Sequence, residues 1–173
     1  MPVYNELNTV LIVLDKLVKL NLYDNFNKEI IIIDDSSTDG TKDLLLNFEK
    51  KNKNNNIKFI YKNKNSGKGD SQKLAIPLCS GDFTIIQDAD LEYDINNINS
   101  LLELISKNNY DAVLGYRKLN KTKIYSTYFF FHKLAVFVLT FLTNILYGSR
   151  FKDVCTCYRM IKTPILKNFK IKG

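Results

Sequence analysis

In the first two thirds of the chain, segments whose apolar residues recur at helical spacing alternate with short apolar segments typical of strands. Apolar residues recur at helical spacing from Leu7 to Leu20, whereas Glu29–Ile33 is an almost unbroken isoleucine run, typical of a strand buried on both faces. The same reading predicts further helices and strands, with Pro77 disturbing the last turn of one helix. The helices are Thr41–Lys51, Asp70–Cys79 and Ile95–Lys107, and the strands are Ile57–Tyr61, Asp82–Gln87 and Ala112–Gly115. This alternation predicts an α/β sandwich with a mainly parallel sheet.

The pattern changes in residues 128–147, which are dense in Phe, Leu, Ile and Val but interrupted by polar residues. A helix that spans a bilayer needs about 20 mainly apolar residues, and the uninterrupted part here is shorter. An amphipathic helix that lies in a membrane interface is therefore the favoured interpretation. A buried core helix remains the alternative.

Composition narrows the classes of function. The 173 residues, 45% of them hydrophobic, fit one domain over 1–173. The net charge of +7 favours phosphates or an anionic membrane surface, while the lack of a basic helix or aromatic stacking motif argues against nucleic acid. Three cysteines without metal-ligand spacing indicate a reducing compartment. A single histidine, His132, leaves a Ser-His-Asp mechanism almost without a base.

Three alternating carboxylates, Asp88, Asp90 and Glu92, follow the apolar strand that ends near Gln87. If that segment stays extended, its alternate side chains point the same way. Carboxylate oxygens suit Mg²⁺ or Mn²⁺, and Mg²⁺ commonly shares its coordination with substrate phosphates. The cluster therefore predicts a metal-bound diphosphate, and a solvated acidic turn is the alternative.

Two earlier segments could complete such a site. Asp34 and Asp35 end a predicted strand, where a carboxylate can accept hydrogen bonds from a ribose or a base, or can cap the next helix. Gly67-Lys68-Gly69 places flexible backbone and one cation at a helix start, which suits phosphate, although the full P-loop pattern is missing.

Taken in order, these motifs resemble the family 2 glycosyltransferases, which are inverting enzymes of the GT-A fold. The similarity lies in Pro2-Val3-Tyr4-Asn5-Glu6, in residues 34–41 and 67–69, and in residues 87–94. Residues 115–117, the Phe/Leu-rich helix and residues 153–159 look like the polyprenyl-phosphate branch, which includes dolichol-phosphate mannosyltransferases. The implied fold is a three-layer GT-A sandwich. Because the resemblance begins at Pro2 and stops early, the chain is expected to be truncated at both ends.

The resemblance also implies roles for individual residues. Nucleotide-sugar contacts would come from Pro2, Tyr4, Glu6, Asp34, Asp35, Lys68 and Asp88, and the metal from Asp88, Asp90 and Glu92. Arg117 and Arg159 would meet the acceptor phosphate, and Asp153 would orient the acceptor or act as a base. Asp90, Arg117 and Asp153 are the predicted catalytic residues.

The expected reaction is metal-dependent transfer of a hexose from a UDP- or GDP-linked sugar to a polyprenyl phosphate, with inversion. A lipid phosphate is anionic near neutral pH, so its oxygen can attack without a strong base. The expected location is the cytoplasmic face of a membrane, as a peripheral protein. Transfer to a glycan hydroxyl, and a non-catalytic nucleotide-sugar-binding or membrane-surface module, are the alternatives. Neither the donor base and sugar nor the oligomeric state follows from the sequence.

Overall fold

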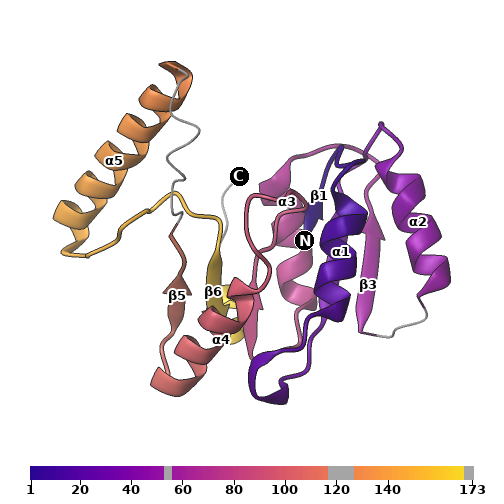
Figure 1. Cartoon of the computed structure of the whole chain (residues 1–173), viewed down its shortest axis with the longest axis horizontal. Helices are drawn as coiled ribbons and strands as arrows, with labels where there is room; N and C mark the ends of the chain where they lie inside the picture. The colour runs from indigo at the N-terminus through magenta and orange to yellow at the C-terminus, as the bar shows by residue number, and fades with distance from the viewer. Residues whose placement is uncertain (53–55, 117–126, 170–173) are drawn as a thin grey trace. The chain divides into compact units, whose positions relative to one another are not determined.

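The computed structural model describes residues 1–52, 56–116 and 127–169 (Figure 1). The chain forms two compact units, one made of Met1–Val113 and Met160–Gly173 and the other of Leu114–Arg159. That residues 1–173 act as a single catalytic domain stays a prediction.

A parallel three-stranded sheet forms the centre of the first unit. Its strands are β1 (Pro2–Val3), β2 (Ile30–Asp34) and β3 (Ile57–Tyr61), in the order β1-β2-β3. Pro2 pairs with Ile33, and Ile33 pairs with Ile60, all in parallel. Every residue of β2 is buried, as the isoleucine run predicted. The carboxyl ends of the three strands therefore lie along one edge.

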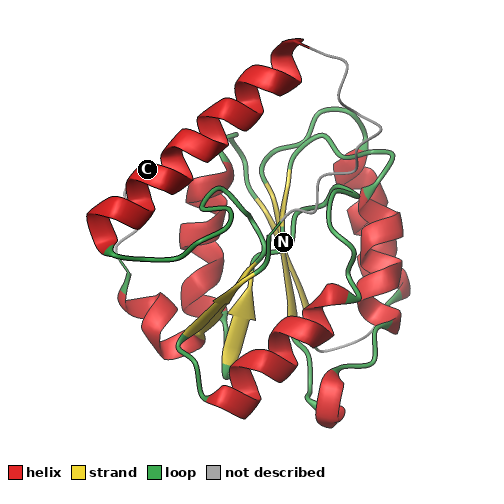
Figure 2. Ribbon diagram, turned by 60° about the vertical axis from the view of Figure 1, so that its left-hand side comes forward, coloured by secondary structure: helices red, strands yellow, loops and turns green. Residues whose placement is uncertain are grey.

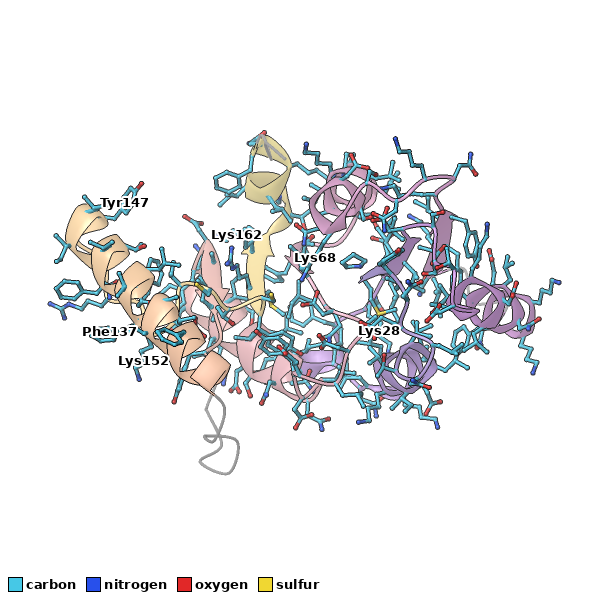
Figure 3. The ribbon with its side chains drawn as sticks, turned by 90° about the horizontal axis from the view of Figure 1, so that it is seen from above. Lys28, Lys68, Phe137, Tyr147, Lys152 and Lys162 are labelled. Atoms are coloured by element: carbon cyan, nitrogen blue, oxygen red, sulfur yellow. The ribbon has the colours of Figure 1, made fainter. Side chains whose placement is uncertain are left out.

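Helices α1 (Val10–Lys19) and α3 (Lys68–Ala75) lie on opposite sides of these strands (Figure 3). Helix α2 (Thr41–Lys51) packs beside α1. The buried residues of α1 are spaced three or four apart, at Val10, Val13, Leu14 and Leu17. Helix α3 ends earlier than predicted and continues as the 3₁₀ turn η2 (Ile76–Leu78), which contains Pro77. The expected disturbance by proline is confirmed.

A second sheet contains β4 (Phe83–Ile85), β6 (Arg159–Lys162) and β5 (Ala112–Leu114), in the order β4-β6-β5. Figure 2 draws the strands of the chain in yellow. Strand β6 runs antiparallel to β4, with Thr84 opposite Ile161. The sequence reading did not predict β6. The remaining elements of the first unit are η1 (Tyr23–Asn25), α4 (Asn97–Asn108) and α6 (Thr163–Asn168).

Helix α5 (Thr127–Tyr147) dominates the second unit. Many of its described apolar side chains are exposed, among them Phe137 at 66%, Ile145 at 63% and Tyr147 at 80%. Among the described residues, no helix combines the length and apolarity needed to cross a bilayer. The helix predicted over 128–147 is thus present, and its apolar side is uncovered within its own unit.

Candidate functional site

A cavity of about 210 Å³ lies where the segments after β1, β2 and β4 meet the start of α3. It gathers most of the residues that the sequence predicted to hold a nucleotide sugar. Its lining is Pro2, Val3, Tyr4, Glu6, Asp35, Lys68, Ser71, Asp88, Ala89 and Asp90. The site therefore forms beyond the carboxyl ends of the parallel strands β1 and β2, as the fold class predicted, and is completed by the segment that follows β4 of the second sheet.

The loop after β1 is braced by the loop after β2. The N–H groups of Asn5 and Glu6 donate to the hydroxyls of Ser37 (3.0 Å) and Thr41 (2.9 Å). Asp39 accepts from the N–H of Leu7 at 3.2 Å and from the Thr41 hydroxyl at 2.6 Å. These bonds fix the backbone that carries Tyr4 and Glu6 into the cavity wall. The brace was not predicted from the sequence.

Asp34 and Asp35 differ sharply although both are buried. Asp34 accepts the Ser37 N–H through Oδ2 at 3.2 Å, its Oδ1 has no partner in the described part of the chain, and it does not line the cavity. Asp35 does line it. Burial alone would raise the pKa of Asp35, but hydrogen bonds from Lys62 and from the N–H groups of Ser66 and Gly67 outweigh burial and lower it. Asp35 is therefore an ionised acceptor at neutral pH.

Lys68, at the start of α3, reaches the carboxylate that follows β4. Its ammonium lies 2.6 Å from Asp88 Oδ1. Asp90, which also lines the cavity, accepts the Glu92 N–H at 3.0 Å through Oδ1. In this cavity the lysine can neutralise an anionic ligand, and the two carboxylates can neutralise a cation that the ligand carries.

The predicted three-carboxylate metal group is not formed. Among residues 1–52, 56–116 and 127–169, no three His, Cys, Asp or Glu side chains gather as a metal site. Strand β4 ends at Ile85, and residues 89–93 bend, so the alternation of an extended segment does not apply to Glu92. Glu92 is exposed and does not line the cavity. The donor set here is two carboxylates, which fits a hard cation only if a substrate supplies further oxygens.

Two residues at or near the cavity, Ser71 and Lys62, were not predicted from the sequence. Ser71 lies one turn after Lys68 and lines the cavity, and its hydroxyl, fully buried, has no partner among the described atoms. Lys62 follows β3 and forms ion pairs with Asp35 and Asp70 at 2.6 and 2.7 Å. Neither residue belongs to a short motif, so only the fold could reveal them.

The predicted acceptor residues belong to the second unit. Asp153 Oδ1 accepts the Cys155 N–H at 2.9 Å, and Arg159 donates to the carbonyls of Thr156 (2.7 Å) and Val154 (3.1 Å). The Arg159 guanidinium thus closes the loop that begins at Asp153. Arg117 lies outside the described residues.

Two polar side chains of α5 hold the loop that precedes Asp153. Asn144 exchanges hydrogen bonds with the backbone of Phe151 in both directions, at 2.8 and 2.9 Å. One turn earlier, the Thr140 hydroxyl accepts the Val154 N–H at 3.2 Å. Two of the polar interruptions of the apolar sequence, Thr140 and Asn144, therefore secure the loop, and their spacing of four residues places them on one side of the helix.

Residues 1–169 match the family model described as glycosyl transferase family 2. An uncharacterized protein of Methanocaldococcus jannaschii is 31% identical over 98% of this chain and 72% of its own length. The dolichyl-phosphate beta-glucosyltransferase of Dictyostelium discoideum is 35% identical over 67% of this chain and 38% of its own. The dodecaprenyl-phosphate galacturonate synthase of Rhizobium johnstonii is 22% identical over 99% of this chain. This chain spans about half, 49%, of that last relative.

Solved structures share the fold. The glucosyl-3-phosphoglycerate synthase of Mycobacterium tuberculosis, in complex with UDP, aligns with a TM-score of 0.68 at 18% identity, over 95% of this chain and 56% of its own. A mannosyltransferase of Pyrobaculum calidifontis, in complex with GDP-Man and Mn²⁺, aligns with a TM-score of 0.57 at 20% identity, over 66% and 33%. These likenesses confirm the GT-A fold that the motifs predicted.

Proposed function

Because the chain belongs to glycosyl transferase family 2, we propose that it transfers a hexose from a UDP- or GDP-linked sugar to a polyprenyl phosphate, with inversion and with a divalent metal. One observation carries the proposal. The cavity brings together Asp35, Lys68, Asp88 and Asp90 from three separate segments. Those groups match, in order, a base or ribose, a diphosphate and its cation.

On the donor side, Pro2, Tyr4 and Glu6 form the wall of the nucleotide pocket and Asp35 accepts from the base or ribose. Lys68 lies against Asp88 and exchanges that carboxylate for a phosphate oxygen when the donor binds. Asp34 supports the turn that follows Asp35 through the Ser37 N–H. Lys68 is the group among these whose charge opposes that of the diphosphate.

Asp88 and Asp90 are the residues that would hold the metal, Mg²⁺ or Mn²⁺. When bound, that ion would supply Lewis-acid chemistry and positive charge for a departing nucleoside diphosphate. The structural relative that contains GDP-Man and Mn²⁺ supports this assignment by analogy of fold. Glu92 takes no direct part, because it lies away from the cavity lining.

The acceptor is a lipid phosphate, as the names of two relatives suggest. Its second pKa is about 6, so the attacking oxygen is already anionic at neutral pH. Arg117 and Arg159 orient it, and Asp153 positions the loop that carries Arg159 rather than removing a proton. Alignment and charge neutralisation then supply the catalysis.

The enzyme works peripherally at the cytoplasmic face of a membrane. Helix α5 exposes Phe137 and Tyr147 (Figure 3), and it has no acidic residue along its length. An exposed apolar helix without negative charge suits the interface of an anionic bilayer. This location would bring the phosphate of a membrane lipid to the enzyme.

The test is a transfer assay with polyprenyl phosphate in detergent or liposomes, a panel of labelled UDP- and GDP-sugars, and Mn²⁺ or Mg²⁺. Label should appear in a chloroform-soluble product that mild acid releases. Asp88→Asn should lose the activity, while Asp15→Asn, which alters an exposed carboxylate on α1, should retain it. Label that appears only in a soluble glycan would overturn the acceptor assignment.

A further inference from the structure

Lys62 joins three segments of the donor side although it does not line the cavity. Its ammonium lies 2.6 Å from Asp35 Oδ1 and 2.7 Å from Asp70 Oδ2, and it also donates to the Ser66 hydroxyl. The Lys62 side chain is only 12% exposed. The Lys62–Asp35 pair is largely shielded from water, so removing Lys62 would leave a buried carboxylate without its charge partner.

Asp35 has little capacity left for a ligand. Besides Lys62, it accepts the N–H of Ser66 through Oδ1 at 3.1 Å and the N–H of Gly67 through Oδ2 at 2.7 Å. An ionised carboxylate offers roughly four acceptor positions and no donor. With three positions filled by the protein, about one remains for the cavity that Asp35 lines.

Asp70 closes the arrangement at its other end. It accepts from Lys62 and, at 2.6 Å, from the Ser66 hydroxyl. The turn at Ser66 and Gly67 is thereby tied to Asp35 through its backbone and to Asp70 through its side chain. Gly67 has φ = 90°, a conformation that glycine adopts without strain. Lys68, which pairs with Asp88, follows immediately.

We propose that Lys62 is a positioning residue for the donor: it fixes Asp35 as a pure acceptor with one position facing the cavity, and it fixes the turn that delivers Lys68. This rests on the proposed function. The inference also defines the class of base. Uracil and guanine offer a ring N–H to such an acceptor, whereas cytosine and adenine carry an unprotonated nitrogen at the matching ring position and offer only an exocyclic amino group. The site should therefore select UDP- or GDP-linked donors over CDP- or ADP-linked ones.

A purely structural lysine would stabilise the fold without changing base selection. Lys58, on β3, provides a matched comparison because it forms a 2.7 Å ion pair with Glu29 and is 47% exposed. Removing either lysine breaks an ion pair. Only removal of Lys62 frees Asp35 and the Ser66–Gly67 turn.

The experiment is calorimetric titration of UDP, GDP, CDP and ADP, each with Mn²⁺, into the wild-type chain and its Lys62→Met, Lys62→Arg and Lys58→Met variants. Lys62→Met should weaken UDP or GDP binding by about tenfold or more, the usual effect of losing a hydrogen bond to a charged group. It should also narrow the preference over CDP and ADP. Lys62→Arg should restore part of the affinity, and Lys58→Met should match the wild type.

The outcomes separate the two proposals. A wild-type chain that binds neither UDP nor GDP would overturn the proposed function. Wild-type binding with unchanged affinity and base preference in Lys62→Met would overturn the role of Lys62 alone. Thermal unfolding of each variant shows whether it folds. If Lys62→Met does not fold, Asp70→Asn decides, because Asp70 is 49% exposed: weaker nucleotide binding supports the inference and unchanged binding overturns it.

Discussion

The cavity residues and the loop beside α5 are held by hydrogen bonds that span very different lengths of chain. In the first unit, the bonds from Asn5, Glu6 and Gly67 to their side-chain partners cross 32, 35 and 32 residues. In the second, the bonds of Asn144, Thr140 and Arg159 to the loop cross 7, 14 and 3. The geometry of the cavity wall thus depends on the pairing of the strands, whereas the loop with Asp153 is organised by its own neighbours. Changes in the two regions should have separable effects.

The largest effect is expected at Asp88. Asp88→Asn removes the charge that pairs with Lys68 at 2.6 Å, so transfer should fall by about 100-fold or more, as when one charge-stabilising group is lost from an active site. Thermal unfolding should change little, because the pair is partly exposed. A variant that keeps half of the wild-type transfer rate would contradict the assignment of the donor site.

Asp90 and Glu92 sharpen the definition of the site. Asp90→Asn should reduce transfer by about tenfold or more, since Asp90 lines the cavity. Glu92→Gln should stay within about twofold, because Glu92 only donates its backbone N–H to Asp90. Initial rates measured against Mn²⁺ concentration give the comparison. Equal losses in both variants would restore the three-carboxylate site predicted from the sequence.

Asn144→Ala tests the second region. It removes the bonds to both backbone groups of Phe151, which should lower the free energy of unfolding by about 1–3 kcal/mol or loosen the loop locally. Hydrogen exchange should rise in residues 149–155, and KM should rise for the acceptor but not for the donor. Asn108→Ala, which loses one exposed bond at the end of α4, is the control. A rise in the donor KM would show that the regions are coupled.

The exposed side of α5 gives a smaller, separate effect. Phe141 is 54% exposed and stacked on Phe137. The Phe141→Asp variant should bind liposomes about tenfold more weakly, because a negative charge replaces apolar area at an anionic surface. Cosedimentation with anionic vesicles measures this. Nucleotide affinity in solution should be unchanged, and unaltered vesicle binding would remove α5 as the membrane contact.

The smallest effect is the dependence of stability on pH. Asp35 has a lowered pKa in the folded chain, so between that value and about 3.9 the unfolded state binds more protons. The stability it contributes is complete above the unfolded pKa and is lost as pH falls through the folded one. Urea unfolding between about pH 2.5 and 5 should show a shallower loss for Lys62→Met than for the wild type. Parallel curves would mean that Lys62 does not set the charge of Asp35.

Local patterns were enough for much of the framework. The ranges Thr41–Lys51 and Ile57–Tyr61 agree with the structure residue for residue, because a helical period and a short run rich in isoleucine and aromatic residues are properties of neighbouring residues. The short strand β6 escaped prediction, since four residues carry too little periodicity. The bend of residues 89–93 after β4 also escaped, and it ends the side-chain alternation on which the grouping of Glu92 with Asp88 and Asp90 rested.

The sequence by itself determined the order of the elements, the family and the carboxylates that end β2 and follow β4. Only the tertiary structure decided which of them line one cavity, which lysine pairs with Asp35, and that Glu92 is not among the lining residues. The physical reason is the distance along the chain over which each kind of interaction acts. Side-chain alternation and helical spacing act over a few residues, whereas the contacts of Lys62, Asp35 and Thr41 depend on how strands and loops more than twenty residues apart align.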